Sequence, residues 1–102
     1  MSKTNYFFKL IPPRATFPGD ITPEESALMD EHAEYLRKEF EAGRALIYGP
    51  VFRPDGAFGM TVREVADEAE ARAFAEKDPS VRAGMNRWEI YPMRVVGARA
   101  NA

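Results

Sequence analysis

Cysteine is absent from the 102-residue chain, which excludes disulfide bonds, thiolate catalysis and thiolate metal sites. Histidine occurs once, as His32, so no cluster of histidines is available to bind a metal ion. A single histidine could in principle be an axial haem ligand, but nothing else in the sequence supports a haem site. We therefore expect a protein that works without a metal or another cofactor.

Long apolar runs are missing as well. No run approaches the length of a membrane span, and residues 1–9 lack the apolar core and cleavage site of a signal peptide. An excess of one charge is also missing, since 14 Lys and Arg stand against 16 Asp and Glu. No basic patch for nucleic acid or an anionic membrane is apparent. We expect a cytoplasmic protein that binds neither.

What the chain does contain is typical of one small globular domain. Its residues are 45% hydrophobic and 29% charged, a mixture found in folded rather than disordered proteins. We place a single domain at residues 1–97 and a flexible tail at residues 98–102. A chain of this size buries only about two-thirds of its unfolded surface. Association with a second copy would bury more.

The first half of the chain predicts a strand and then a long helix. Residues 5–11 carry apolar side chains on both faces, which is typical of a central strand. A helix over residues 23–41 begins with a capping box made by Thr22 and Glu25, and Gly43 ends it. Its expected inner stripe consists of Leu28, Met29, His32, Leu36 and Phe40.

The second half predicts a hairpin and a last strand. Residues 44–51 and 57–65 are expected to pair across the turn at residues 53–56. The last strand is expected over residues 87–96. Pro92 lies inside it and has no N–H group, so this strand should be an edge or carry a bulge.

A second helix is expected between the hairpin and the last strand. Asp67 is its N-cap, and its inner stripe contains Ala71, Phe74 and Ala75. The same spacing continues at Asp78, which predicts that this carboxyl group also points inward. A short helical turn should follow over residues 79–83.

The order strand, helix, strand, strand, helix, strand predicts a ferredoxin-like α+β fold. Right-handed crossovers then give a four-stranded antiparallel sheet with both helices on one face. The other face of the sheet keeps apolar residues that nothing in the monomer covers. Such a face usually marks an interface, so we expect a homodimer packed through the sheets.

His32 has two interpretations. It lies between Met29 and Leu36 on the inner stripe, where a neutral histidine with both nitrogens hydrogen-bonded can serve as a core residue. Alternatively, it is a general acid/base in the wall of a pocket between helix and sheet, because imidazole titrates near neutral pH. The periodicity alone leaves both interpretations open.

Asp78 also has two interpretations. An aspartate before proline is an ordinary cap for a new turn of helix. Its inward phase also allows it to reach His32, where a carboxylate would fix the ring tautomer and orientation. Tyr35, Tyr48 and Trp88 are candidates to line a ligand cavity, although buried aromatic residues usually belong to the core.

Several segments together resemble the YCII-related (YciI-like) domain family. They are MDEHAEYL at residues 29–36, YGP at 48–50, DEAEARAF at 67–74, DPSVRAG at 78–84 and WEIYPM at 88–93. The resemblance covers nearly the whole chain and implies the dimeric α+β barrel fold of the muconolactone isomerases. It also implies a His–Asp active-site pair, which falls on His32 and Asp78. It supplies no substrate.

The segment from Pro12 to Thr22 looks long for the shortest members of that family. It is expected to be a surface loop with two turns. It could also fold over the mouth of the pocket, in which case Arg14 would anchor a substrate carboxylate.

Two functions remain open from the sequence. One is a cofactor-free lyase, isomerase or dehalogenase-like enzyme that moves a proton on a small organic acid through His32 and Asp78, with Arg14, Tyr35 and Tyr48 binding the substrate. The other is a non-enzymatic dimeric module that binds a ligand or serves a partner, in which His32 only shapes the cavity.

Overall fold

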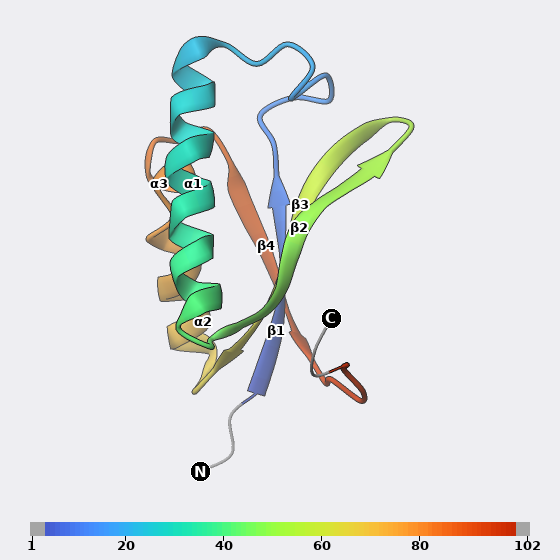
Figure 1. The fold of residues 1–102 in the computed structure, drawn as a ribbon, viewed down its shortest axis with the longest axis vertical. Helices are drawn as coiled ribbons and strands as arrows, with labels where there is room; N and C mark the ends of the chain where they lie inside the picture. The colour runs from blue at the N-terminus through green and yellow to red at the C-terminus, as the bar shows by residue number, and fades with distance from the viewer. Residues whose placement is uncertain (1–3, 100–102) are drawn as a thin grey trace.

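The computed structural model describes residues 4–99, which form four strands and three helices (Figure 1). They are β1 (Thr4–Ile11), α1 (Pro23–Glu41), β2 (Ala45–Arg53), β3 (Gly56–Val65), α2 (Glu68–Glu76), α3 (Pro79–Arg82) and β4 (Arg87–Met93). In the expected tail, residues 98 and 99 carry no helix or strand, and residues 100–102 lie outside the described part. Among the described helices, none is long and apolar enough to cross a membrane.

The strands form one antiparallel sheet in the order β2-β3-β1-β4. All three helices lie on the same side of it (Figure 1). β1 is central, as its two apolar faces predict, and β4 is an edge, as Pro92 requires. The expected ferredoxin-like α+β fold is confirmed, with α3 as the short helical turn after Asp78.

The ends of α1 follow from local side-chain chemistry. The Thr22 hydroxyl accepts a hydrogen bond from the Glu25 main-chain N–H, and the Glu25 carboxylate accepts one from the Thr22 N–H. This is the capping box that the sequence predicts, and it satisfies two N–H groups that the helix leaves free. The helix stops before Gly43, whose φ of 82° is in the left-handed region that glycine tolerates.

The inner stripe of α1 differs from the expected one at its C-terminal end. Phe40 was expected to point inward but is 49% exposed, whereas Glu39 is only 9% exposed. The next buried residue of α1 after Leu36 is Glu39, three positions further on. Glu39 is buried because Arg63 of the sheet lies opposite it and pairs with its carboxylate. The Arg63 and Arg44 guanidinium groups each hydrogen-bond the Glu39 carboxylate, at 2.8 to 3.0 Å.

The last strand is shorter than expected. β4 ends at Met93 rather than at Val96. Met93 pairs with Asn5, and β1 begins only one residue earlier, at Thr4. Within residues 4–99, only Thr4 of β1 lies beyond this pair.

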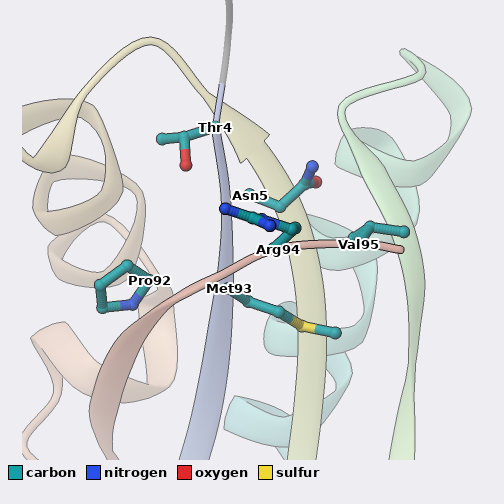
Figure 2. A pocket seen from close by; sticks show the side chains of 6 residues that line it. All are labelled: Thr4, Asn5, Pro92, Met93, Arg94 and Val95. Carbon is teal, nitrogen blue, oxygen red and sulfur yellow. The ribbon is translucent and has the colours of Figure 1, made fainter. Parts of the chain in front are cut away.

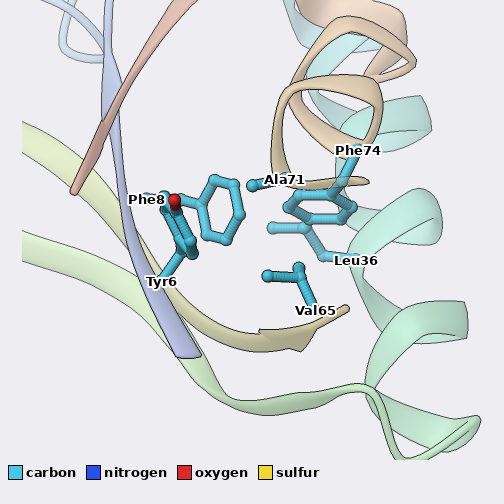
Figure 3. Close-up of a cluster of buried hydrophobic side chains, with 6 residues drawn as sticks. All are labelled: Tyr6, Phe8, Leu36, Val65, Ala71 and Phe74. Carbon is cyan, nitrogen blue, oxygen red and sulfur yellow. The ribbon is translucent and has the colours of Figure 1, made fainter. Parts of the chain in front are cut away.

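The hydrophobic core lies between the sheet and the helices. Figure 3 shows Tyr6 and Phe8 of β1 facing Phe74 of α2. Phe8 has no solvent exposure, and its ring packs edge-on against Phe74 with the centroids 4.9 Å apart. Leu36, Val65 and Ala71 complete the cluster. This core holds α1 and α2 against the strands and so positions the residues between them.

The sheet face opposite the helices carries one row of apolar side chains, with polar side chains such as Lys9 and Glu89 beside it. The register places Ile47, Val62, Phe7 and Tyr91 in one row across all four strands, on the face away from Phe8. Ile47 is 54% exposed and Tyr91 is 50% exposed. Val62 is only 3% exposed, so the single chain leaves mainly the two ends of this row, Ile47 and Tyr91, open to solvent.

The Glu39–Arg63 pair makes stability depend on pH. Burial raises the pKa of Glu39, but the hydrogen bonds from Arg44 and Arg63 outweigh it and hold the pKa below the ordinary 4.5. A lowered folded-state pKa contributes stability above pH 4.5 that is lost as the pH falls through the folded value. The Glu39→Gln variant, which leaves Arg63 without its carboxylate, should lose roughly 3 kcal/mol at pH 7. The free energy of unfolding of this variant should also fall less than that of the wild type as the pH is lowered from 7 to 3.

Urea unfolding of both proteins between pH 7 and pH 3 measures this difference. Glu31→Gln, at an exposed position on the same helix, is the matched control and should keep the wild-type profile. If wild type and Glu39→Gln lost the same unfolding free energy between pH 7 and pH 3, the lowered pKa of Glu39 would be contradicted.

The exposed Ile47 and Tyr91 side chains on this face of the sheet predict self-association. Sedimentation at micromolar concentration should show a dimer, because burying such a face against a second copy removes it from water. Ile47→Glu should shift the population toward the monomer, whereas Phe40→Glu, at a similarly exposed position on α1, should not. A wild-type monomer at these concentrations would exclude the sheet-packed dimer.

Candidate active site

His32 and Asp78 are in direct contact although they are 46 positions apart in the chain. His32 lies in the middle of α1, and Asp78 is the N-cap of α3. The His32 Nδ1 and Asp78 Oδ2 atoms are 2.7 Å apart, a short and charge-assisted distance. His32 is 7% exposed, and Asp78 is fully buried. The core therefore shields this hydrogen bond from water.

The other oxygen of Asp78 is held by Ser80. Asp78 Oδ1 accepts hydrogen bonds from the Ser80 main-chain N–H at 2.9 Å and from its hydroxyl at 2.8 Å. Asp78 thus caps α3 and contacts His32 at the same time, so both of its interpretations describe real contacts. Because an ionised carboxylate can only accept hydrogen bonds, the contact requires His32 Nδ1–H as the donor, and a neutral ring would then carry its lone pair on Nε2.

His32 lines a cavity of about 390 Å³. The wall is built from α1, the sheet and the loop after β1, whose Phe17, Pro18 and Ile21 form part of it. Tyr48 and Trp88 also line the cavity. Among the described residues in this wall, none is Lys, Arg, Asp or Glu. The volume is in the range of small-molecule sites, and an apolar lining with few polar groups is typical of them.

Arg14 does not line this cavity. Its guanidinium group makes a two-pronged pair with Glu25 at 2.7 and 2.8 Å and also binds Asp20 at 3.0 Å. The hydrogen bonds from Arg14 lower the pKa of Glu25 to about 2. Arg14 therefore ties the loop to the start of α1. To bind a substrate carboxylate, as the sequence suggests, it would have to leave both acidic partners.

The two tyrosine candidates lie in different places. Tyr48 contacts the cavity, whereas Tyr35 does not. The Tyr35 hydroxyl donates to the main-chain oxygen of Phe74 at 2.7 Å, and the two rings stack with centroids 5.4 Å apart. Burial raises the pKa of Tyr35 to about 12. These contacts give Tyr35 a place in the core, beside the site rather than in it.

A second hollow lies at the other end of β1. Figure 2 shows the residues that line it. They lie at the start of β1, at the end of β4 and just after β4, and they include Asn5 and Arg94. It contains no acid/base pair. Within residues 4–99 there is also no group of three His, Cys, Asp or Glu side chains that could hold a metal ion. The cavity beside His32 is therefore the better candidate for chemistry.

Sequence reasoning did not single out two polar residues of the cavity wall. Thr61 of β3 and Asn86, just before β4, both line the cavity and are almost fully buried. The strand periodicity places Thr61 on the helix side of the sheet, which was the available signal. Asn86 lies between a helical turn and a strand, so no period applies to it.

No curated protein matches the chain. A 5-chloro-2-hydroxyhydroquinone dehydrochlorinase from Burkholderia phenoliruptrix, solved with 2,5-dihydroxybenzoquinone, is similar in structure at 18% identity and a TM-score of 0.60, covering 87% of this chain and 93% of its own. An uncharacterized protein from Thermotoga maritima is similar at 14% identity and a TM-score of 0.56, covering 91% and 100%.

Identities this low establish a shared fold, which agrees with the sheet order and helix placement seen here. The sequence itself gives a family match. Residues 11–94, from the end of β1 to just past β4, match the YCII-related domain. Both of the paired residues, His32 and Asp78, lie inside this span. The chain belongs to the YCII-related domain family.

Proposed function

We propose that this protein is a small enzyme that transfers protons on a small organic molecule bound in the cavity beside His32. The observation that carries the proposal is the buried 2.7 Å contact between His32 Nδ1 and Asp78 Oδ2 at the wall of that cavity. A buried carboxylate that orients an imidazole is a recurrent arrangement in acid/base catalysis.

Each residue has a distinct role in this proposal. His32 is the general base or acid and acts through Nε2, because Nδ1 is occupied by Asp78. Asp78 keeps the ring in one tautomer and stabilises the imidazolium after it takes a proton. Ser80 holds the carboxylate from its other side and is a positioning residue.

Two proton-balanced reactions fit these roles. In an isomerisation, Nε2 removes a proton from one substrate atom and returns it to another. In an elimination, the electron pair of the broken bond to hydrogen expels a leaving group such as chloride, and the imidazolium later loses its proton to water. Either reaction needs only side-chain groups. General acid/base catalysis by His32 would accelerate it by about 10²–10⁴-fold.

The cavity favours a small cyclic or aromatic substrate. Its volume of about 390 Å³ and its lining of aromatic and aliphatic side chains suit one ring. Tyr48, Trp88 and Phe17 provide the apolar contacts. The structurally similar dehydrochlorinase is named for a chlorinated hydroxyhydroquinone, a substrate of this size whose reaction is an elimination.

The alternative is a binding module in which His32 only shapes the cavity. Its support is the apolar wall, which would hold a ligand without any reaction. The two functions differ in whether substitution of His32 removes turnover or only alters affinity.

The tautomer of His32 is a direct prediction. Nitrogen-15 NMR of the single imidazole should show Nδ1 protonated and Nε2 bare in the neutral ring, the reverse of the tautomer preferred in water. Asp78→Asn should weaken this preference, because an amide lacks the negative charge. An Nε2–H ring in the wild type would contradict the assigned role of His32.

Turnover is the second prediction. With 5-chloro-2-hydroxyhydroquinone as the test compound, wild type should release chloride, and His32→Gln should lose about 10²–10⁴-fold in kcat. The kcat of Asp78→Asn should also fall, by a large part of the decrease expected for His32→Gln. Arg37→Gln, on the exposed face of α1, should retain full activity. Equal rates for wild type and His32→Gln would remove the acid/base role.

A further inference from the structure

Three buried polar side-chain atoms in the described part of the chain have no hydrogen-bond partner, and all three belong to residues that line the cavity. They are Thr61 Oγ1, Asn86 Oδ1 and Trp88 Nε1. Roughly 90% or more of buried polar groups in proteins are hydrogen-bonded, so such exceptions call for an explanation. All three atoms are closed off from the cavity although their residues line it, so a ligand that supplies the partners requires these side chains to turn toward it.

Asn86 and Trp88 lie beside His32. The ring centroids of Trp88 and His32 are 6.1 Å apart. The Asn86 side-chain amide donates to Met29 Sδ at 3.5 Å, and Met29 lies one helical turn before His32. Thr61 lies on β3, which β1 separates from β4, so it marks a different part of the wall.

Asn86 is also held by the segment that holds Asp78. Its main-chain N–H donates to the Ser80 main-chain oxygen at 3.1 Å. Ser80 in turn binds the Asp78 carboxylate through its N–H and hydroxyl. The unpartnered Asn86 oxygen and the His32–Asp78 pair therefore share one rigid support.

The chemistry of the two atoms selects the ligand group. Asn86 Oδ1 can only accept a hydrogen bond, and Trp88 Nε1 can only donate one. A hydroxyl group can serve both, since it donates and accepts. An ionised carboxylate cannot donate to Asn86, and the described residues of the wall offer no Lys or Arg to neutralise it. Arg14 is held by Glu25 and Asp20.

We propose that Asn86 and Trp88 form a hydrogen-bonding subsite that takes the hydroxyl group of an uncharged hydroxylated ring and discriminates against carboxylates. The inference rests on the proposed function in that it concerns the same cavity. It narrows the substrate class from small cyclic or aromatic molecules to uncharged compounds that carry a hydroxyl group. It also makes Asn86 a specificity-determining residue that holds the ring beside His32 Nε2.

Three probes with the same ring test the subsite. Phenol can donate and accept, anisole can only accept, and benzoate is charged. Trp88 is the only tryptophan of the chain, so its fluorescence reports binding without a label. Wild type should bind phenol about tenfold or more tighter than either other probe, because each of these leaves a buried acceptor unpaired. Equal binding of the three, a preference for benzoate, or no phenol binding at millimolar concentration would overturn the proposal.

Variants of Asn86 provide the matched comparison. Asn86→Leu removes the acceptor at similar volume, so the preference for phenol over anisole should fall to about one, with anisole affinity little changed. Asn86→Asp keeps an acceptor at the same position and should retain the preference for phenol while excluding benzoate further. Circular dichroism checks that each variant is folded. Retention of the full phenol preference in folded Asn86→Leu would refute the assignment.

The readout separates this inference from the proposed function. Probe affinities are measured without turnover. If His32→Gln leaves turnover unchanged while the phenol preference depends on Asn86, the enzyme proposal fails and the subsite stands. If turnover depends on His32 but all variants bind the three probes alike, the subsite fails and the enzyme proposal stands.

Discussion

A carboxylate with no exposure to solvent imposes the strictest requirement in this molecule. Removing such a group from water is unfavourable unless each oxygen is hydrogen-bonded, and Asp78 meets this condition only with both His32 and Ser80 in place. His32 comes from α1, and Ser80 comes from α3. Correct packing of two helices that are distant in sequence is thus a precondition for burying Asp78. The pair belongs to the fold as much as to the proposed site.

The inner face of α1 carries two buried polar systems. His32 binds Asp78, and Glu39, about two turns further on, binds Arg63. Leu36 lies between them and joins the hydrophobic cluster with Phe8 and Phe74. Polar pairs in a core add less stability than apolar packing, and our hypothesis is that these two pairs limit the alternative alignments of α1. These pairs would therefore fix the position of α1 along the sheet and, with it, the place of His32 in the cavity wall.

Much of the fold could be predicted because its determinants are local. Thr22 and Glu25 specify the start of α1, and the apolar residues on both faces of β1 identify it as a central strand. The spacing of the buried residues of α2 predicts that Asp78 points inward. Phe40 could not be placed correctly, because apolar character suggests burial, and the sequence does not reveal that Arg63 lies opposite Glu39. The partners of Arg14 and the unpaired oxygen of Asn86 likewise depend on contacts between distant segments.

The ion pairs of Arg14 have a consequence for how the family can vary. Glu25 closes the capping box of α1 and also anchors the loop that forms part of the cavity wall. Replacement of Arg14 alone would remove one attachment of the loop and leave Glu25 with only its capping contact, whereas replacement of Glu25 alone would weaken the helix start and leave Arg14 with Asp20 as its acidic partner. Positions 14 and 25 are therefore expected to change together among relatives that keep this loop.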